Sequence, residues 1–176
     1  MISADLELFD PVAGVSVLGP AMTQPRSGHA AAKLANGKVL IAGGTSIDGV
    51  LQSAELYDPE TGATTQTALP MLSPRAGASA TTLIDGRVLI AGGNNGTADL
   101  RSAEIFEPSS QIFEATTTPL SFARSGHAAV LLPNNNSVLI AGGSSNGVPV
   151  KTSDLFVPAE FPDPYSYGMG SFAQTG

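Results

Sequence analysis

Three arginines recur along the chain at a constant spacing, because Arg26, Arg75 and Arg124 lie 49 residues apart. A guanidinium group holds a carboxylate or sulfate through two parallel hydrogen bonds, so three of them on one face would form a site for an acidic ligand or an acidic peptide side chain. A residue that returns in each copy of a repeat also serves the scaffold, here by bonding the carbonyl groups of neighbouring loops. The spacing favours the scaffold role and leaves the anion site as the alternative.

A second set of candidates consists of Asp and Asn side chains in polar segments. Their oxygen atoms are of the kind that Ca²⁺ prefers. They do not follow the alternating Asp spacing of a calcium loop, and Asn and Asp are common turn formers. We therefore expect no metal site, and we interpret these residues as turn residues on a face that meets a binding partner. The candidates are Asp48, Asn94, Asn95, Asp99 and Asn146.

Nucleophilic and metal chemistry have little support in the sequence. His29 and His127 occupy equivalent positions, but no further ligands stand at metal-binding spacing, so we expect hydrogen-bonded scaffold imidazoles. Residues 143–147 fit Gly-x-Ser-x-Gly, yet a hydrolase needs a strand–turn–helix there and a later His. The count of 0 Cys excludes disulfides and thiolate sites. We expect no catalytic residue, no metal and no cofactor.

An internal repeat reveals the elements that must position these side chains. The segment Val-Leu-Ile-Ala-Gly-Gly stands at residues 39–44, 88–93 and 138–143, at offsets of 49 and 50. Its lack of alternation predicts a strand buried on both faces. Each glycine pair ends that strand at a point where we expect close backbone approach or a positive φ. The six structural glycines are Gly43, Gly44, Gly92, Gly93, Gly142 and Gly143.

Each period contains signals for four short strands and none for a helix. Residues 28–34 predict the first strand, and Asn36-Gly37 predicts a hairpin turn into the second. A polar loop leads to the third strand, Ser-Ala-Glu-Leu-Tyr-Asp-Pro at residues 53–59, and a weaker fourth strand lies near residues 63–69. We letter these strands a to d.

Four antiparallel strands per repeat of about 50 residues are typical of a β-propeller blade. The motifs Arg-x-Gly-His, Val-Leu-x-Ala-Gly-Gly and Ala-Glu-x-Tyr-Asp-Pro resemble the kelch repeat in its bacterial form, over residues 3–158. The resemblance implies an all-β fold of kelch-type blades in an incomplete ring of about three to three and a half blades. Kelch blades usually carry a Trp on strand d, whereas this chain has 0 Trp, so packing between blades must rely on Leu, Ile and Val.

The sequence predicts 13 strands, in the order c and d, then two complete sets of a to d, then a, b and c. This order divides the chain into blades. We considered that strands a and b of one copy, residues 126–141, join strands c and d of another in a composite blade. The expected units are a half blade (1–20), two blades (21–69 and 70–118), a partial blade (119–158) and a flexible tail or linker (159–176).

Composition limits the classes of partner. The net charge of −7 leaves nothing to neutralise a run of phosphates, so we expect no nucleic-acid partner. No apolar run approaches the roughly 18 residues of a membrane helix. The first residues lack the basic start of a signal peptide. We leave the compartment open, and an extracellular or cell-surface location fits if the sequence belongs to a longer exported protein.

These observations favour a non-catalytic binding or scaffold module that recognises a protein, or a glycan, through its b–c and d–a loops. One alternative is a structural arc that assembles with itself into a ring or filament. Another is part of a larger kelch-propeller enzyme acting on carbohydrate, such as a sugar epimerase. A copper radical oxidase resembling galactose oxidase is excluded, because it needs a Cys. The expected partners are a protein or glycan, together with further copies or the remainder of a longer chain.

Overall fold

Four-stranded antiparallel sheets repeat along the chain in the computed structural model, which describes residues 2–159 and 169–175. Each sheet has the order a-b-c-d, and we call them blades 1 to 3. Blade 1 comprises β3 (Ala30–Lys33), β4 (Val39–Ala42), β7 (Ala54–Asp58) and β8 (Ala63–Gln66). Blade 2 comprises β9 (Ser79–Thr82), β10 (Val88–Ala91), β11 (Ala103–Glu107) and β12 (Ile112–Ala115). Blade 3 comprises β13 (Ala128–Leu132), β14 (Ser137–Ala141), β17 (Ser153–Val157) and β18 (Ser171–Thr175).

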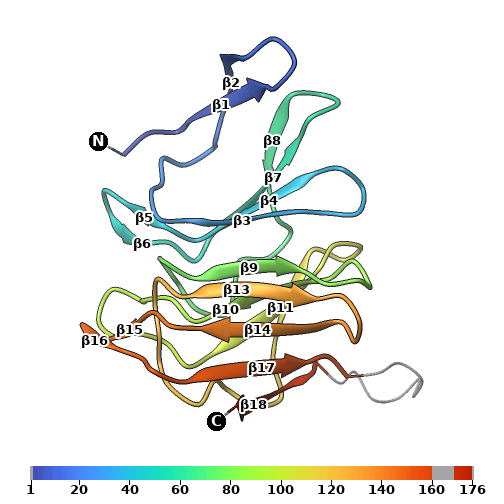
Figure 1. The fold of residues 1–176 in the computed structure, drawn as a ribbon. Coiled ribbons are helices and arrows are strands. Elements are labelled where there is room, and N and C mark those ends of the chain that lie inside the picture. Colours follow the sequence, from blue (N-terminus) through green and yellow to red (C-terminus); the bar gives the residue numbers. More distant parts are fainter. Residues whose placement is uncertain (1, 160–168, 176) are drawn as a thin grey trace.

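Short hairpins accompany the blades. The N-terminal hairpin of β1 (Asp5–Asp10) and β2 (Val15–Ala21) forms the c and d strands of a half blade beside blade 1. The b–c loops of blades 1 and 3 fold into hairpins of their own: β5 (Thr45–Ser46) with β6 (Gly49–Val50), and β15 (Ser144–Ser145) with β16 (Val148–Pro149). Both lie at the same end of the blades (Figure 1).

Local sequence explains why these strands form and where they turn. Gly37 in the predicted Asn-Gly turn has φ +85°, and Asn36 Oδ1 accepts a hydrogen bond from the Lys38 N–H at 3.2 Å. A type of turn that needs a positive φ favours glycine there. The strands β4 and β10 are buried almost throughout, which confirms the strand predicted from the repeat.

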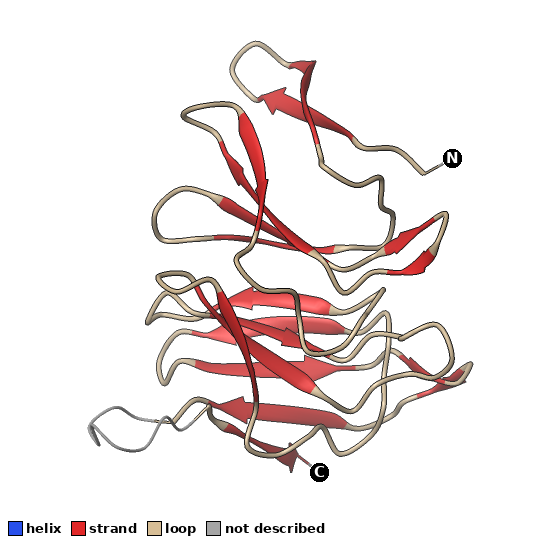
Figure 2. Cartoon of the chain, turned by 180° about the vertical axis from the view of Figure 1, so that it is seen from behind, coloured by secondary structure: helices blue, strands red, loops and turns tan. Residues whose placement is uncertain are grey.

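The apolar core lies between neighbouring blades. Leu40 and Leu56 of blade 1 pack with Val88, Ile90 and Phe106 of blade 2 in one cluster. The same arrangement returns one step along the chain, where blade 2 packs on blade 3. The innermost strands β3, β9 and β13 are neighbours, so the three blades are arranged side by side about a common edge (Figure 1). Figure 2 shows the strands from behind, with no helix in the described parts of the chain. Accordingly, no helix there is long and apolar enough to cross a membrane.

The end of the chain corrects the predicted flexible tail. Ser171–Thr175 form β18, which pairs with β17 in register from Ser153↔Thr175 to Val157↔Ser171. Phe172 packs on Phe156 with ring centroids 5.2 Å apart. Blade 3 is therefore complete, and the prediction of a linker is wrong for these residues; the rest of that prediction, at residues 160–168 and 176, lies outside the described part. The composite blade is also wrong, because β13 and β14 already share a sheet with β17.

Candidate functional site

The three repeated arginines are buried inside the d–a loops, the loops that lead into strand a of each blade. Arg26 is 3% exposed, and Arg75 and Arg124 are 0% exposed. The Arg75 guanidinium donates to the carbonyl oxygens of Gly92 at 2.7 Å and Ser102 at 3.1 Å. It also donates to the carboxylate of Glu104 at 2.5 Å. Each arginine thus closes its own blade by joining the d–a loop to strands b and c.

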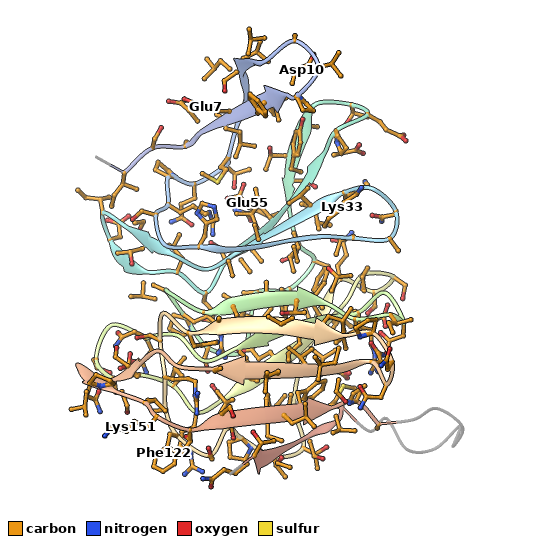
Figure 3. The ribbon with its side chains drawn as sticks, in the orientation of Figure 1. Glu7, Asp10, Lys33, Glu55, Phe122 and Lys151 are labelled. Atoms are coloured by element: carbon orange, nitrogen blue, oxygen red, sulfur yellow. The ribbon has the colours of Figure 1, made fainter. Side chains whose placement is uncertain are left out.

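The same contacts recur in all three blades. Arg26 pairs with Glu55, which Figure 3 labels inside blade 1, and Arg124 pairs with Asp154 at 2.7 Å. The carboxylate of Glu104 also accepts hydrogen bonds from the N–H groups of Leu72 at 2.7 Å and Ser73 at 3.1 Å. We call this buried set the arginine clip. The interpretation of these arginines as an anion-binding site is wrong, because the side chains are buried and their terminal nitrogen atoms already donate to carboxylates and carbonyl oxygens of their own blades; the scaffold interpretation is confirmed.

The glycine pairs stand where blades meet. All six glycines have positive φ, between +61° and +94°. A Cβ built on Gly43 would lie 2.1 Å from the carbonyl oxygen of Arg75 in the next d–a loop, and one on Gly92 would lie 2.4 Å from that of Arg124. Real Cβ atoms do not approach other atoms so closely, so only glycine fits these two positions. The expected positive φ is confirmed at all six glycines, and the close approach is confirmed at all of them except Gly142.

The polar candidates of the b–c loops form two separate groups. Asp48 is exposed at the tip of the β5–β6 hairpin. Asp99 lies elsewhere, where its carboxylate accepts hydrogen bonds from the Asn94 amide at 2.9 Å and the Asn146 N–H at 2.6 Å. Burial alone raises the pKa of Asp99, but hydrogen bonds from Asn94, Asn146 and Ser125 outweigh it and hold the pKa below its usual value. The oxygen of Asn95 accepts two N–H groups of its own turn.

These bonds support the interpretation of the Asp and Asn residues as turn formers. Within residues 2–159 and 169–175, no three His, Asp or Glu side chains are grouped so that they would hold a metal ion. Asp99 and Asn146 have a second effect, since they tie the b–c loop of blade 2 to that of blade 3. The b–c loops of blades 2 and 3 are therefore connected to each other.

The expectation of a hydrogen-bonded scaffold imidazole is confirmed for His127, although its partner Ser79 was not predicted. The Nε2 atom of His127 lies 2.9 Å from the hydroxyl oxygen of Ser79 in blade 2. Burial, and to a lesser extent the Arg124 charge, lowers the pKa of His127 to about 4, so the imidazole is neutral at pH 7. This pair joins strand a of two blades. His29 is exposed, because blade 1 has no complete blade before it among the described residues.

The exposed aromatic ring of Phe122 was also missed. It is 49% exposed in the d–a loop of blade 3. Together with Val148, Val150 and Lys151 it lines a cavity of about 300 Å³ at the end of the β15–β16 hairpin (Figure 3). The repeat gave no signal for this ring, because the equivalent position in the preceding repeat is Ser73.

The repeated sheets and clips define the class of the molecule as an all-β protein of propeller-type blades. The chain is similar in fold to the solved structure of YjhT, a kelch-repeat propeller protein, with a TM-score of 0.73 and 13% sequence identity. The match covers 99% of this chain and 65% of the other, so the chain spans about two thirds of that protein's length. At this identity the likeness shows the fold alone. No known family profile and no curated protein matches the sequence.

Proposed function

We propose that this chain is a non-catalytic recognition module that binds a protein partner through the loop end of its blades. The observation that carries this proposal is the exposure of large aliphatic side chains at the hairpin tips on that end. Ile47 at the tip of β5–β6 is 92% exposed, and Val148 in β15–β16 is 66% exposed. Both hairpins lie at the same end of the blades, and exposed apolar side chains on one face favour a protein as the partner.

The framework beneath these tips supports the same proposal. The arginine clips hold each d–a loop against its blade, and the b–c loops project with a different sequence in each blade. A constant scaffold with variable loops is the arrangement that binding proteins commonly use. A catalytic site needs a unique acid–base pair, whereas the charged pairs at this end recur in every blade. The alternative of a carbohydrate-active enzyme depends on the kelch resemblance alone.

The test compares two matched surface variants for binding to arrays of proteins and of glycans. Ile47→Asn alters the loop end, and Ile84→Asn alters a side chain that is 59% exposed at an a–b turn. We expect a protein ligand whose binding falls at least tenfold with Ile47→Asn and is unchanged with Ile84→Asn. A ligand that is lost only with Ile84→Asn would contradict the proposal. Binding to glycans alone, for which Phe122 offers a stacking surface, would contradict the choice of a protein.

A further inference from the structure

The two complete contacts between blades share one set of main-chain hydrogen bonds. We call residues 71–75 and 120–124 the lead-in segments, because each runs along the preceding blade before entering its own. In the first, the Arg75 N–H donates to the Leu51 carbonyl at 3.1 Å, and the Arg75 carbonyl accepts the Gly44 N–H at 2.9 Å. In the second, Arg124 makes the same two bonds, with Leu100 at 3.1 Å and Gly93 at 2.8 Å.

A side chain completes each contact. Gln52 Nε2 donates to the carbonyl of Met71 at 2.5 Å, and Arg101 Nε donates to the carbonyl of Leu120 at 2.8 Å. Met71 and Leu120 are 1% and 0% exposed, and each is part of the apolar cluster between two blades. A lead-in segment thus binds the preceding blade through a buried Met or Leu and through its main chain. Four residues after that Met or Leu, an arginine returns to the segment's own blade.

Blade 3 presents the same groups a third time on its side away from blade 2. Gly143, Val150 and Lys151 are the counterparts of Gly44, Leu51 and Gln52 in the repeat. The Gly143 N–H and the Lys151 amine donate no hydrogen bond to a described residue, and the Val150 carbonyl accepts none from one. Val150 and Lys151 also line the cavity beside Phe122. The polar groups that hold a lead-in segment are thus in place, without a partner among the described residues.

Gly142, which precedes Gly143, differs from its counterparts Gly43 and Gly92 in what lies next to it. Gly142 has φ +71°, as its counterparts Gly43 and Gly92 have positive φ. A Cβ built on Gly142 meets no atom within 4 Å, whereas on Gly43 and Gly92 it would meet the carbonyl of the following arginine. The surface of blade 3 therefore has the shape that elsewhere accommodates the next d–a loop.

The apolar face of blade 3 repeats the pattern. Leu40 and Leu56 are 0% and 5% exposed under blade 2. Their counterparts in blade 3, Leu139 and Leu155, lie in register on adjacent strands and are only partly buried, next to Val130, which is 56% exposed. In blades 1 and 2 the following blade covers these apolar side chains. In blade 3 their counterparts are only partly buried.

We propose that this side of blade 3 is a docking site for a further blade of the same repeat, whose lead-in segment carries Met or Leu four residues before an Arg. A second intact copy of the chain does not supply it, because each of its lead-in segments is already bonded. Even residues 22–26 are held, since the N–H groups of Met22 and Arg26 donate to the carbonyls of Ala4 and Ser3. This docking site is separate from the hairpin tips of the proposed function and goes beyond it.

The test adds a fourth repeat to the full chain. A copy of residues 68–115 is joined after Gly176, so that Gly176 takes the place of Thr67 before it. Hydrogen exchange is then measured at the Gly143 amide. We expect exchange at least ten times slower than in the original chain, because Gly143 would donate to the added arginine's carbonyl as Gly44 and Gly93 do. Equal exchange in the two chains would overturn the proposal.

Two variants of the extended chain serve as controls. Gly142→Asn tolerates the positive φ but places a side chain in the path of the added carbonyl, so fast exchange at Gly143 should return. In the original chain the same variant should leave the melting temperature within about 2 °C, which shows that it folds. Lys151→Gln should keep the slow exchange, because Gln52 serves this position in blade 1. Slow exchange in the original chain that depends on protein concentration would identify a second copy as the occupant and overturn the proposal.

Discussion

Each blade is closed by one buried arginine, and this residue is placed by three segments that are distant in sequence. The Arg75 side chain contacts the ends of strands b and c, and its partner Glu104 is 29 residues away. Burying two charges has a large desolvation cost, which close pairing and additional hydrogen bonds offset. The Glu104 carboxylate has those bonds, from two N–H groups of the d–a loop. The clip therefore specifies how the loop lies on its blade.

Arg75→Ala should lower the free energy of unfolding by about 3–5 kcal/mol, because it leaves the Glu104 carboxylate buried without its cation. Arg26→Ala and Arg124→Ala should have similar effects. The double variant Arg75→Met with Glu104→Gln should lose less than Arg75→Ala alone, because no net charge stays buried. Urea denaturation measures all four; a loss below about 1 kcal/mol for Arg75→Ala would show that the clip does not hold the blade.

His127 should make the stability depend on pH. Its pKa is about 4 in the folded protein and near 6.5 in an unfolded chain, so the unfolded state binds more protons between these values. The stabilisation is complete above about pH 6.5 and is lost as the pH falls to about 4, by roughly 3 kcal/mol. His127→Ala, which copies Ala78 of blade 2, should remove most of this slope. If denaturation at pH 4 to 7 gave the same slope for the wild type and the variant, His127 would not be the source of the pH dependence.

At the level of elements, β18 shows that the fourth strand of a blade need not follow the repeat. In blades 1 and 2 four residues separate strand c from strand d, whereas in blade 3 strand c ends at Val157 and β18 begins at Ser171. It is held by its ladder with β17, by the Phe172 ring on Phe156, and by a bond of 2.7 Å from the Phe172 N–H to the Thr118 hydroxyl. These contacts tie the end of the chain to the d–a loop of blade 3.

Phe172→Ala should destabilise the protein by about 2 kcal/mol, because it removes a partly buried ring from the cluster between blades 2 and 3. Gln174→Ala, which changes an exposed side chain of the same strand, is the matched control and should stay within about 0.5 kcal/mol. Hydrogen exchange should also become faster along β17 in the first variant. Equal stability of the two variants in urea would mean that β18 adds nothing to blade 3.

For the whole molecule, the arrangement of three blades and a half leaves two ends open. At the N-terminal end, β1 pairs only with β2, and the hairpin exposes Phe9 by 66% and Leu18 by 74%. An unpaired strand edge beside large apolar side chains promotes association. At the other end stands the open face of blade 3, with Val130 and Leu139. Both ends are open because each blade buries its apolar side chains against a neighbouring blade.

The purified chain should self-associate at micromolar concentration through the N-terminal hairpin. Light scattering should report a mass above the 17.8 kDa of one chain. The double variant Phe9→Ser with Leu18→Lys should lower that mass, and Ile84→Ser, at a distant turn, should not. A particle of one chain with a melting temperature that does not change with concentration would contradict this expectation.

The strands and turns of blades 1 and 2 were predictable because they depend on local chemistry. Asn36-Gly37 makes a hairpin turn wherever it occurs between two strands, and Val-Leu-Ile-Ala followed by two glycines suits a strand buried on both faces. The period of 49 residues then indicates a propeller blade without reference to any contact. β18 escaped prediction because it has no counterpart at that period, and its pairing depends on a sheet that must form first.

The role of the candidate site residues depended on contacts between distant segments. The repeat spacing of Arg75 favoured a scaffold role, but nothing near it in sequence shows that Glu104 and the carbonyls of Gly92 and Ser102 surround its guanidinium. The pairing of His127 with Ser79 likewise arises from the packing of two strands 48 residues apart. A charged side chain is exposed or buried according to what the tertiary fold brings against it, and the strength of its interactions follows from that burial.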